Sequence, residues 1–222
     1  MKKLFICLAN SKKYGERCVA GIEVKRSDKG TLVIVNKGDK PKWIRPVTNL
    51  NYGAVPEHLV QDAKLLDVYE IDITEETPNG YQSENVKFNL KSLKKISSLG
   101  ANNSNLEVLK EDNRSTLFSN RGKAVPEDRI NDVDYSLVLL KAEHPEIFTK
   151  TYDSGGTQIR IKFHYKGNQY DLPITDKDFL KQYTVNNSIF DNADTIYVTV
   201  SLGVVHEGWH YKLAAGIICI NE

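Results

Sequence analysis

Residues 4–24 read LFICLANSKKYGERCVAGIEV, and residues 197–220 read YVTVSLGVVHEGWHYKLAAGIICI. Each stretch contains an apolar run typical of a strand, then a polar loop, then a second apolar strand. The second strands match, since residues 17–22 read RCVAGI and residues 212–217 read KLAAGI. Small residues inside a strand let another backbone approach closely or let the strand coil sharply, as small closed barrels require. The two stretches therefore predict compact β-barrels at both ends of the chain.

The residues between these two stretches continue the β pattern. Residues 156–174 alternate around a Lys166-Gly167-Asn168 turn and predict a hairpin. Residues 56–63 and 177–183 predict short helices, the second capped by Thr175 or Asp176. Strands and helices do not alternate, so a parallel sheet is not expected. We expect an all-β fold with one or two short helices, arranged as two OB-like small barrels.

A polar segment at residues 111–132 predicts the boundary between the two barrels. The N-terminal barrel is expected to span residues 1–115 and the C-terminal barrel residues 125–222. At 222 residues, with 40% hydrophobic residues, the chain is long enough for two small cores.

Composition limits the partners and the location. The chain has 30 Lys and Arg against 29 Asp and Glu, so a nucleic acid or an anionic membrane would have to be held by a local patch. The three cysteines form no CxxC and are expected to be unpaired in a reducing cytosol. No apolar run approaches the ~20 residues of a membrane span. We expect a soluble cytoplasmic protein with no membrane partner.

Five ordered blocks of this sequence resemble a prokaryotic family, the dual OB-containing domain. The blocks are CLANSKKYGERCVAG at residues 7–21, WIRP at 43–46, YQSENVKF at 81–88, IKFHYKGNQYDLPITD at 161–176, and SLG with YKLAAGII near the end. The resemblance covers nearly the whole chain. It implies two OB-like barrels and a link to nucleic acid, often in bacterial defence systems that act in conflicts with phages and mobile elements. It implies no catalytic residue.

The strand expected at residues 159–166 carries a row of basic side chains. By the period of two, Arg160, Lys162, His164 and Lys166 share one face, spaced by about 6.6–6.8 Å. That spacing resembles the phosphates of a single strand, so this face predicts a nucleic-acid-binding track. The alternative is an ordinary solvated face, or an edge strand that lysines protect from aggregation.

Aromatic residues beside cations give a second set of candidates. Trp43 and Arg45 lie in WIRP, and Trp209, Tyr211 and Lys212 open the last strand. Single-strand binders stack bases on aromatic rings and place cations beside them. The alternative is that both tryptophans belong to the barrel cores.

No catalytic constellation is visible in the sequence. It contains no HxxxH, HxH or GxSxG pattern and no phosphate-binding GxxxxGKS or GxxxxGKT. Glu23-Val24-Lys25 matches the ExK of metal-dependent nucleases, but the preceding strand has no partner Asp. The acidic run at residues 67–76 lacks converging ligands. We expect a non-catalytic protein that needs no metal and no cofactor.

The leading hypothesis is a protein that binds single-stranded DNA or RNA, or a nucleotide-like ligand, through its barrels. The alternative is an adaptor whose barrels dock an effector protein, which a net charge of only +1 favours. A hydrolase with a concealed site is the third reading. The sequence does not distinguish DNA from RNA or define the oligomeric state.

Overall fold

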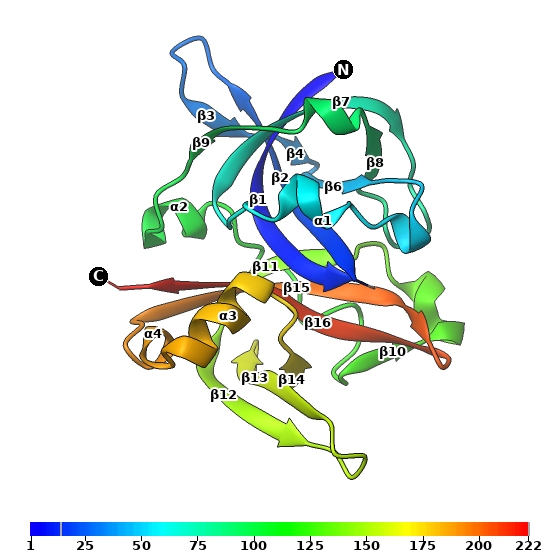
Figure 1. The fold of residues 1–222 in the computed structure, drawn as a ribbon, viewed down its shortest axis with the longest axis vertical. Helices are drawn as coiled ribbons and strands as arrows, with labels where there is room; N and C mark the ends of the chain where they lie inside the picture. Colours follow the sequence, from blue (N-terminus) through cyan, green and yellow to red (C-terminus); the bar gives the residue numbers. More distant parts are fainter. Residues whose placement is uncertain (14, 222) are drawn as a thin grey trace.

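The computed structural model describes residues 1–13 and 15–221. About 53% of it is strand and 15% helix, which confirms the all-β class. Two barrels lie one above the other, and the N-terminal barrel is the upper one in Figure 1. The described residues contain four short α-helices, more than the one or two expected. The helices are α1 (Glu57–Val60), α2 (Asn103–Glu107), α3 (Lys177–Val185) and α4 (Ser188–Asp191).

The two expected helices begin where the sequence predicted. In α3, the Asp176 carboxylate caps the helix by accepting a hydrogen bond from the Phe179 amide at 3.0 Å. The additional helix α2 follows a polar segment in which the Asn102 side chain accepts a hydrogen bond from the Asn105 amide at 2.9 Å. Short 3₁₀ turns complete the helical content: η1 (Asn51–Gly53), η2 (Leu90–Ser92) and η3 (Glu127–Asp132).

The N-terminal barrel is closed by five strands in the order β1-β2-β6-β8-β7, and β7 pairs back with β1. All neighbours are antiparallel except β6 and β8, which pair in parallel over three residue pairs. The helix α1 lies between the third and fourth strands. This order and helix position are those of an OB barrel. The strands are β1 (Lys2–Lys13), β2 (Glu16–Arg26), β6 (Trp43–Val47), β7 (Asp67–Glu76) and β8 (Asn85–Phe88).

Four short strands extend this barrel. β3 pairs with β2, β9 pairs with β7, and β4 and β5 form a small hairpin between β3 and β6. Their bounds are β3 (Leu32–Ile34), β4 (Asn36–Lys37), β5 (Lys40–Pro41) and β9 (Lys94–Ser98).

The C-terminal unit is a half-barrel with the same strand order. One sheet runs β10-β16-β15-β11 and the other β12-β13-β14, and both enclose one apolar core. Only one parallel bridge, between Ile174 after β14 and Ala214 in β16, joins the third strand to the fifth. The hairpin predicted at residues 156–174 is confirmed as β13 and β14. The strands are β10 (Ala124–Pro126), β11 (Leu137–Lys141), β12 (Glu143–Thr151), β13 (Thr157–Tyr165), β14 (Asn168–Pro173), β15 (Thr195–His206) and β16 (Trp209–Ile220).

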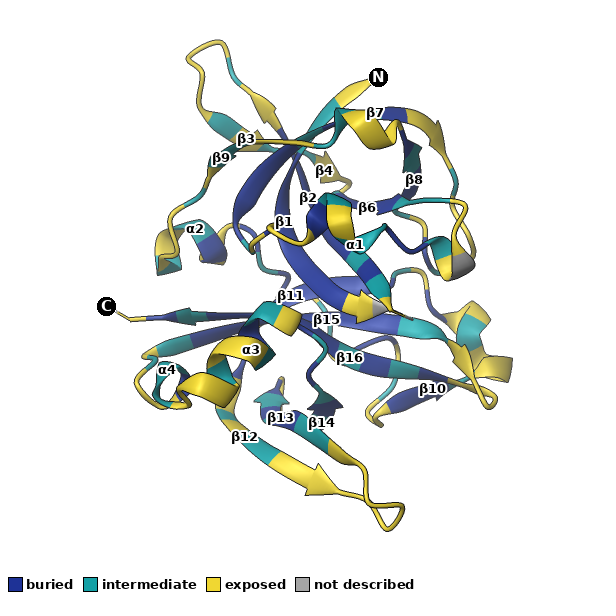
Figure 2. Ribbon diagram, viewed as in Figure 1, coloured by how far each residue is buried: buried dark blue, intermediate teal, exposed yellow. Residues whose placement is uncertain are grey.

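The two units share a third apolar cluster between them. Figure 2 shows that the strands facing each other at this junction are largely buried. In β1, Phe5 and Cys7 point into the closed barrel, whereas Ile6 and Leu8 point into this junction cluster. The outer faces of β11, β15 and β16 supply the opposite side with Leu137, Leu139, Tyr197, Ala215, Ile218 and Ile220. The barrels therefore contact each other through strands that lie far apart in the sequence, and not only through the segment that connects them.

The two matching glycines are sites of close backbone approach, as the sequence predicted. A Cβ at Gly21 would lie 1.9 Å from the Ile6 carbonyl oxygen within the closed barrel. A Cβ at Gly216 would lie 2.2 Å from the Leu8 carbonyl oxygen, which belongs to the other unit. One glycine thus lets its barrel coil tightly, and the other lets the two units touch.

Candidate nucleic-acid interface

The predicted basic face of β13 does not form an open track, because the arginine of the row is buried. Arg160 is 6% exposed. Its guanidinium donates to the Asp171 carboxylate at 2.5 Å, to the Asp171 carbonyl at 2.8 Å and to Gln158 at 2.5 Å. The alternation placed Arg160 on the outer face, but the neighbouring strand β14 covers that face with its own polar groups.

The other members of the row are also paired or separated. Lys162 forms an ion pair with Glu146 at 3.0 Å, and Asp171 lies opposite it on β14. His164 is half-buried, with its ring 6.1 Å from that of His144. Lys166 lies in the exposed hairpin turn. Carboxylates on β12 and β14 therefore pair with two of the four side chains, so the row is not a set of four free, aligned charges. Nucleic-acid binding by these four residues stays a prediction.

Trp43 and Arg45 are buried between the two units. The Trp43 indole donates to the Glu111 carboxylate at 3.0 Å. Arg45 is 2% exposed and forms an ion pair with Glu84 at 3.0 Å, while also donating to the Ser136 hydroxyl at 2.8 Å. Both side chains stabilise the junction, so neither is a surface contact as the single-strand hypothesis required.

Lys212 is also buried and points into the half-barrel. Its ammonium donates to the Asn120 carbonyl at 2.6 Å and lies 5.0 Å from the centre of the Tyr170 ring. Burial lowers the pKa of this ammonium to about 7. Lys212 therefore supports the loop that contains Asn120 and does not face solvent.

Trp209 and Tyr211 remain on the surface. Along β16, alternate residues His210 and Lys212 point inward, so Trp209 and Tyr211 point outward, and Trp209 is 44% exposed. A hollow of about 640 Å³ lies beside the two rings. The hollow is lined by Asn120, Arg121, Gly122, Lys123, Ala124, Trp209 and Tyr211.

Local backbone geometry fixes this arrangement. The hairpin between β15 and β16 turns through Glu207 and Gly208, both with positive φ, as tight hairpin turns require. The short strand β10 pairs with the start of β16 and brings Ala124 opposite Tyr211. Arg121 and Lys123, just before β10, are thereby placed next to the aromatic rings.

A second hollow, of about 260 Å³, lies on the other side of Tyr211 and includes residues of both units. Lys12 from the end of β1 and Gln82 from the β7–β8 loop line it, together with His206 from β15. The Tyr81 hydroxyl holds this loop against the half-barrel by donating to the Gly203 carbonyl at 2.8 Å. We call the combined surface the Trp209 face, and it comprises Lys12, Arg121, Lys123, His206, Trp209 and Tyr211.

The cations of the Trp209 face are accessible to a ligand. Within residues 1–13 and 15–221, Lys12, Arg121 and Lys123 form no ion pair and are exposed. Glu207 at the hairpin turn and Glu127 after β10 lie close by, so the local charge is modestly positive. The face combines two accessible rings with three cations, an arrangement suited to stacking bases and contacting phosphates.

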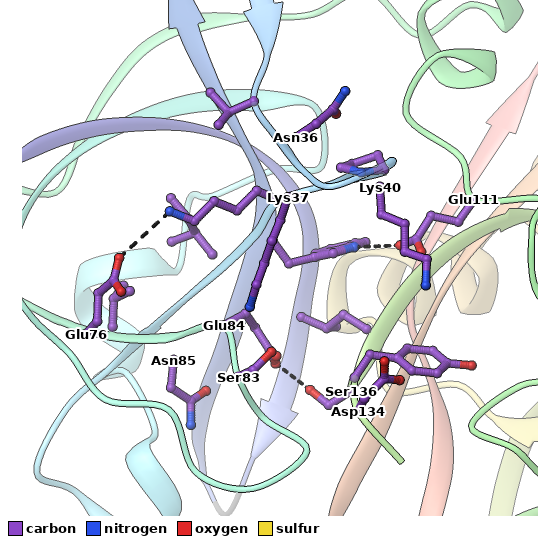
Figure 3. A pocket seen from close by; sticks show the side chains of 18 of the residues that line it. Asn36, Lys37, Lys40, Glu76, Ser83, Glu84, Asn85, Glu111, Asp134 and Ser136 are labelled. Atoms are coloured by element: carbon purple, nitrogen blue, oxygen red, sulfur yellow. Dashed lines mark hydrogen bonds and ion pairs between the residues drawn. The ribbon is translucent and has the colours of Figure 1, made fainter. Parts of the chain in front are cut away.

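A third pocket, of about 580 Å³, lies at the junction of the two units (Figure 3). Its charges are mixed, because Lys37, Lys40, Lys42 and Arg114 line it together with five carboxylate residues. These are Asp39, Glu76, Glu84, Glu111 and Asp134. The pocket is enclosed by both units and does not continue as an open basic groove, so it is a poorer site for a strand of nucleic acid than the Trp209 face.

The described part of the chain also shows how its potential metal ligands, cysteines and helices are placed. Within it, no group of three His, Cys, Asp or Glu residues is placed to hold a metal ion. The described cysteines, Cys7, Cys18 and Cys219, are free thiols. None of the helices in residues 1–13 and 15–221 has the length and apolarity needed to cross a membrane.

The fold defines a tandem OB protein, with one closed barrel and one half-barrel of the same strand order. The chain belongs to the dual OB-containing domain family, whose model matches residues 3–217. The resemblance seen in the sequence blocks is thereby confirmed.

No curated protein matches this sequence. Among solved structures, the chain has a likeness to a deletion mutant of the single-stranded DNA-binding protein from Thermus aquaticus, at 12% identity and a TM-score of 0.22, with 100% of this chain and 93% of that chain covered. At this TM-score the two structures do not superpose as wholes.

Two of the six residues of the Trp209 face, Trp209 and Tyr211, were candidates from the sequence, and the other four were not. Of those four, Arg121 and Lys123 lie in the polar segment interpreted as a domain boundary, and Lys12 and His206 lie at strand ends. The signal available was the Arg121-Gly122-Lys123 turn directly before the short apolar pair Ala124-Val125. Nothing local predicts that this pair forms β10 against β16, because the pairing joins residues far apart in the chain.

Proposed function

We propose that this protein is a non-catalytic binder of single-stranded nucleic acid, DNA or RNA, and that the Trp209 face is its binding surface. The observation that carries the proposal is the meeting of the exposed Trp209 ring and the half-buried Tyr211 ring with three unpaired cations on the Trp209 face. Aromatic rings stack on bases without regard to sequence, and cations beside them contact the backbone.

The position of this face in the two OB units supports the proposal. OB barrels bind oligonucleotides with the loops between strands one and two and between strands four and five. The β15–β16 turn is the four–five loop of the half-barrel. Gln82 lies in the four–five loop of the closed barrel, and Lys12 lies at the one–two turn of the same barrel. Residues from three such loops therefore line or border the two hollows of the Trp209 face, Gln82 lining the smaller hollow.

The proposal is tested by fluorescence anisotropy of short labelled single-stranded DNA and RNA over a salt series. Three cations that contact phosphates predict a log–log slope of roughly −2, at ~0.7 per phosphate for single strands. Removing two of them with Arg121→Ala and Lys123→Ala is expected to leave a slope of about −0.7. Trp209→Ala is expected to weaken binding about fivefold or more, because one base loses its stacking partner.

A matched control is available on β13. The Lys162→Ala and Lys166→Ala double variant removes the same charge from the basic row first predicted from the sequence, and it is expected to leave affinity and slope unchanged. If this variant lowers the slope and the Arg121–Lys123 variant does not, the β13 row is the binding surface. If the wild-type protein binds neither DNA nor RNA at low salt, where attraction between charges is strongest, nucleic-acid binding is rejected and the adaptor hypothesis takes its place.

The remaining parts of the proposal rest on the family resemblance and on composition. They are a cytoplasmic location and a role in prokaryotic conflict with phages or mobile elements. A protein partner encoded nearby would be found by co-purification from the native host. If no partner co-purifies and the protein binds oligonucleotides, the results favour the nucleic-acid function over the adaptor function.

A further inference from the structure

The strand β12 leaves one edge of the half-barrel unpaired. Among the described strands it pairs with β13 alone, and Figure 2 shows its end exposed where the β12–β13 hairpin projects from the molecule. Such an edge presents backbone N–H and C=O groups that another strand can bind. The regular part of the edge is residues 146–151, because the register shifts between Glu143 and Glu146.

The corresponding edge of the closed barrel is covered. β1 corresponds to β11 and β12 taken together, because each pairs with the fourth strand of its barrel at its start and with the second strand towards its end. Near the end of β1, the Lys12 amide donates to the Thr175 carbonyl at 3.0 Å, and Ser11 forms a bridge with Asp176. Within residues 1–13 and 15–221, no segment makes the equivalent pairing with β12, so an edge that is covered in one unit is open in the other.

The hydrogen-bond pattern of the hairpin fixes which backbone groups face outward. Beside its turn, the Tyr152 amide donates to the Gly156 carbonyl at 2.9 Å. Hydrogen-bonded pairs alternate along an antiparallel ladder, so the even-numbered residues from 146 to 150 direct their backbone groups to β13. The backbone groups of Ile147 and Thr149 therefore face the open edge.

The side chains along this edge are complementary to a second copy of themselves. Glu146, Phe148 and Lys150 share the outer face of β12, because Ile147 packs against the core from the other face. Phe148 is half-buried on this outer face, although its partners there on β13 are polar. When two β12 strands pair antiparallel with Phe148 opposite Phe148, each Glu146 lies opposite Lys150 of the second copy.

This register satisfies the backbone and the side chains together. Ile147 and Thr149 form hydrogen-bonded pairs with Thr149 and Ile147 of the second copy, about four bonds in all. The Phe148 pair and the two Glu146–Lys150 pairs are then of the non-hydrogen-bonded type, in which opposing side chains lie closest. Glu146 also pairs with Lys162 at 3.0 Å, so its carboxylate lies between two lysines in the pairing.

We propose that β12 joins two copies of this chain edge to edge, in an antiparallel pairing centred on Phe148. The β12-β13-β14 sheets of the two copies then form one continuous sheet. The inference goes beyond the proposed function, because no residue of the Trp209 face takes part in the pairing. A contact of this length buries less surface than a permanent dimer needs, so the association is weak, with a dissociation constant on the order of 10⁻⁴ M.

Sedimentation equilibrium of the whole chain from ~10 μM to ~1 mM tests the pairing, and the wild type is expected to pass from the monomer mass towards the dimer mass. Lys150→Glu turns both opposite-charge pairs into like-charge pairs and is expected to weaken the association by about tenfold or more. Lys29→Glu is the matched control. It makes the same charge change at an exposed turn outside β12 and is expected to associate as the wild type does.

A mixture of two variants separates specific pairing from a general effect of charge. Lys150→Glu and Glu146→Lys are each expected to be repelled by their own copies. In the mixed pair, both opposite-charge contacts are restored, so the heterodimer is expected to be tighter than either homodimer by about tenfold. If Lys150 served only to keep the edge unpaired, the mixture would show no such gain.

Thr149→Pro tests the backbone contribution. The Thr149 amide faces the open edge, so proline removes a hydrogen bond of the dimer and none of the monomer. We expect the association to be lost while the circular dichroism spectrum and the melting temperature stay as in the wild type. Lys150→Pro, one residue further, removes an amide that is bonded to β13 and is expected to lower the melting temperature.

Any of three results overturns the proposal. The first is a wild-type chain that is monomeric at ~1 mM, which would leave the edge to a strand of a different protein. The second is an association that Lys150→Glu and Thr149→Pro both leave unchanged. The third is a mixture of the two charge variants that associates no better than its components.

Discussion

The closed barrel and the half-barrel have the same strand order but complete it by different means. In the closed barrel, β6 and β8 pair in parallel over three residue pairs, so backbone hydrogen bonds seal the cylinder. In the half-barrel, the corresponding pairing is a single bridge between Ile174 and Ala214. The remaining gap is filled by β10, by Leu117 and Phe118 from the connecting segment, and by the buried Lys212 side chain.

The same strand order is therefore completed by backbone pairing in one unit and by side chains and an added strand in the other. In the closed barrel, the third and fifth strands pair directly, which leaves no space for another segment between them. In the half-barrel, the segment before β10 and the strand β10 itself occupy that space, and this segment places Arg121 and Lys123 on the Trp209 face. The incomplete closure of the second unit is thus the structural origin of the candidate binding surface.

The largest expected effect comes from the seam of the closed barrel. Glu84→Ala leaves the Arg45 guanidinium buried without its carboxylate, and we expect a loss of about 3–5 kcal/mol in the free energy of unfolding. Urea denaturation followed by circular dichroism measures it. Lys87→Ala is the control, because its pair with Glu75 is exposed and is expected to contribute ~0–1 kcal/mol. Equal losses in the two variants would show that the buried pair does not stabilise the seam.

The second effect separates the two glycines. Gly21→Ala and Gly216→Ala each force a Cβ against a backbone oxygen, and we expect each to cost about 3 kcal/mol. Gly21→Ala strains one barrel, whereas Gly216→Ala pushes the units apart. Thermal unfolding should therefore show one transition for Gly21→Ala and two for Gly216→Ala.

Gly156→Ala provides the control for both variants, because the nearest atom to its Cβ would lie 3.9 Å away. It is expected to unfold as the wild type does. A single transition at the wild-type temperature in Gly216→Ala would contradict the close contact between β16 and β1.

The third effect is specific to the seam of the half-barrel and depends on pH. Burial lowers the pKa of Lys212 from 10.5 to about 7, so the folded state binds this proton more weakly than the unfolded state. The free energy of unfolding should therefore rise with pH above about 7, by up to ~1.4 kcal/mol per pH unit. Denaturation between pH 7 and 9 measures the slope.

Lys212→Met removes this titration while keeping the length of the side chain. We expect its stability profile to be flatter than that of the wild type over the same range. An unchanged slope in Lys212→Met would show that other groups cause the pH dependence and that burial of the Lys212 ammonium does not destabilise the folded protein.

The smallest effect compares how readily each unit opens. Cys7 lies inside the closed barrel, where burial and the nearby Asp67 carboxylate raise the pKa of its thiol. Cys219 packs at the half-barrel core, and burial raises the pKa of its thiol to about 11. In a Cys18→Ser background, native-state labelling should modify Cys219 faster than Cys7, because Cys7 is fully buried whereas Cys219 is partly exposed. Faster labelling of Cys7 would indicate that the closed barrel is the less stable unit.

Local sequence patterns predicted the elements that local interactions stabilise. The alternation at residues 156–174 was sufficient for β13 and β14, and the Asp176 cap was sufficient for the start of α3. The glycines in the two matching strands were correctly interpreted as positions where another backbone comes close. Helix α2 was missed because Asn102 and Asn105 stabilise it through a cap and not through an apolar period.

The candidate site was predictable only in part, because exposure depends on neighbours that the local pattern does not specify. Alternation placed Arg160 on an outer face, but Asp171 and Gln158 cover it. Alternation along β16 puts Trp209 and Lys212 on opposite faces of the strand, but the sequence did not show which face points inward. Arg121 lies beside the Trp209 and Tyr211 rings only because β10 pairs with β16.

The sequence by itself determined the all-β class and the strand periodicities, and it indicated two strands whose small residues allow close approach or sharp coiling, because these follow from steric rules and side-chain spacing within a few residues. The tertiary structure alone decided which cations are free, which rings are exposed and where the two units meet. Those properties depend on which distant parts of the chain meet, as where Lys12 and His206 line the same hollow, and on the burial that such meetings produce.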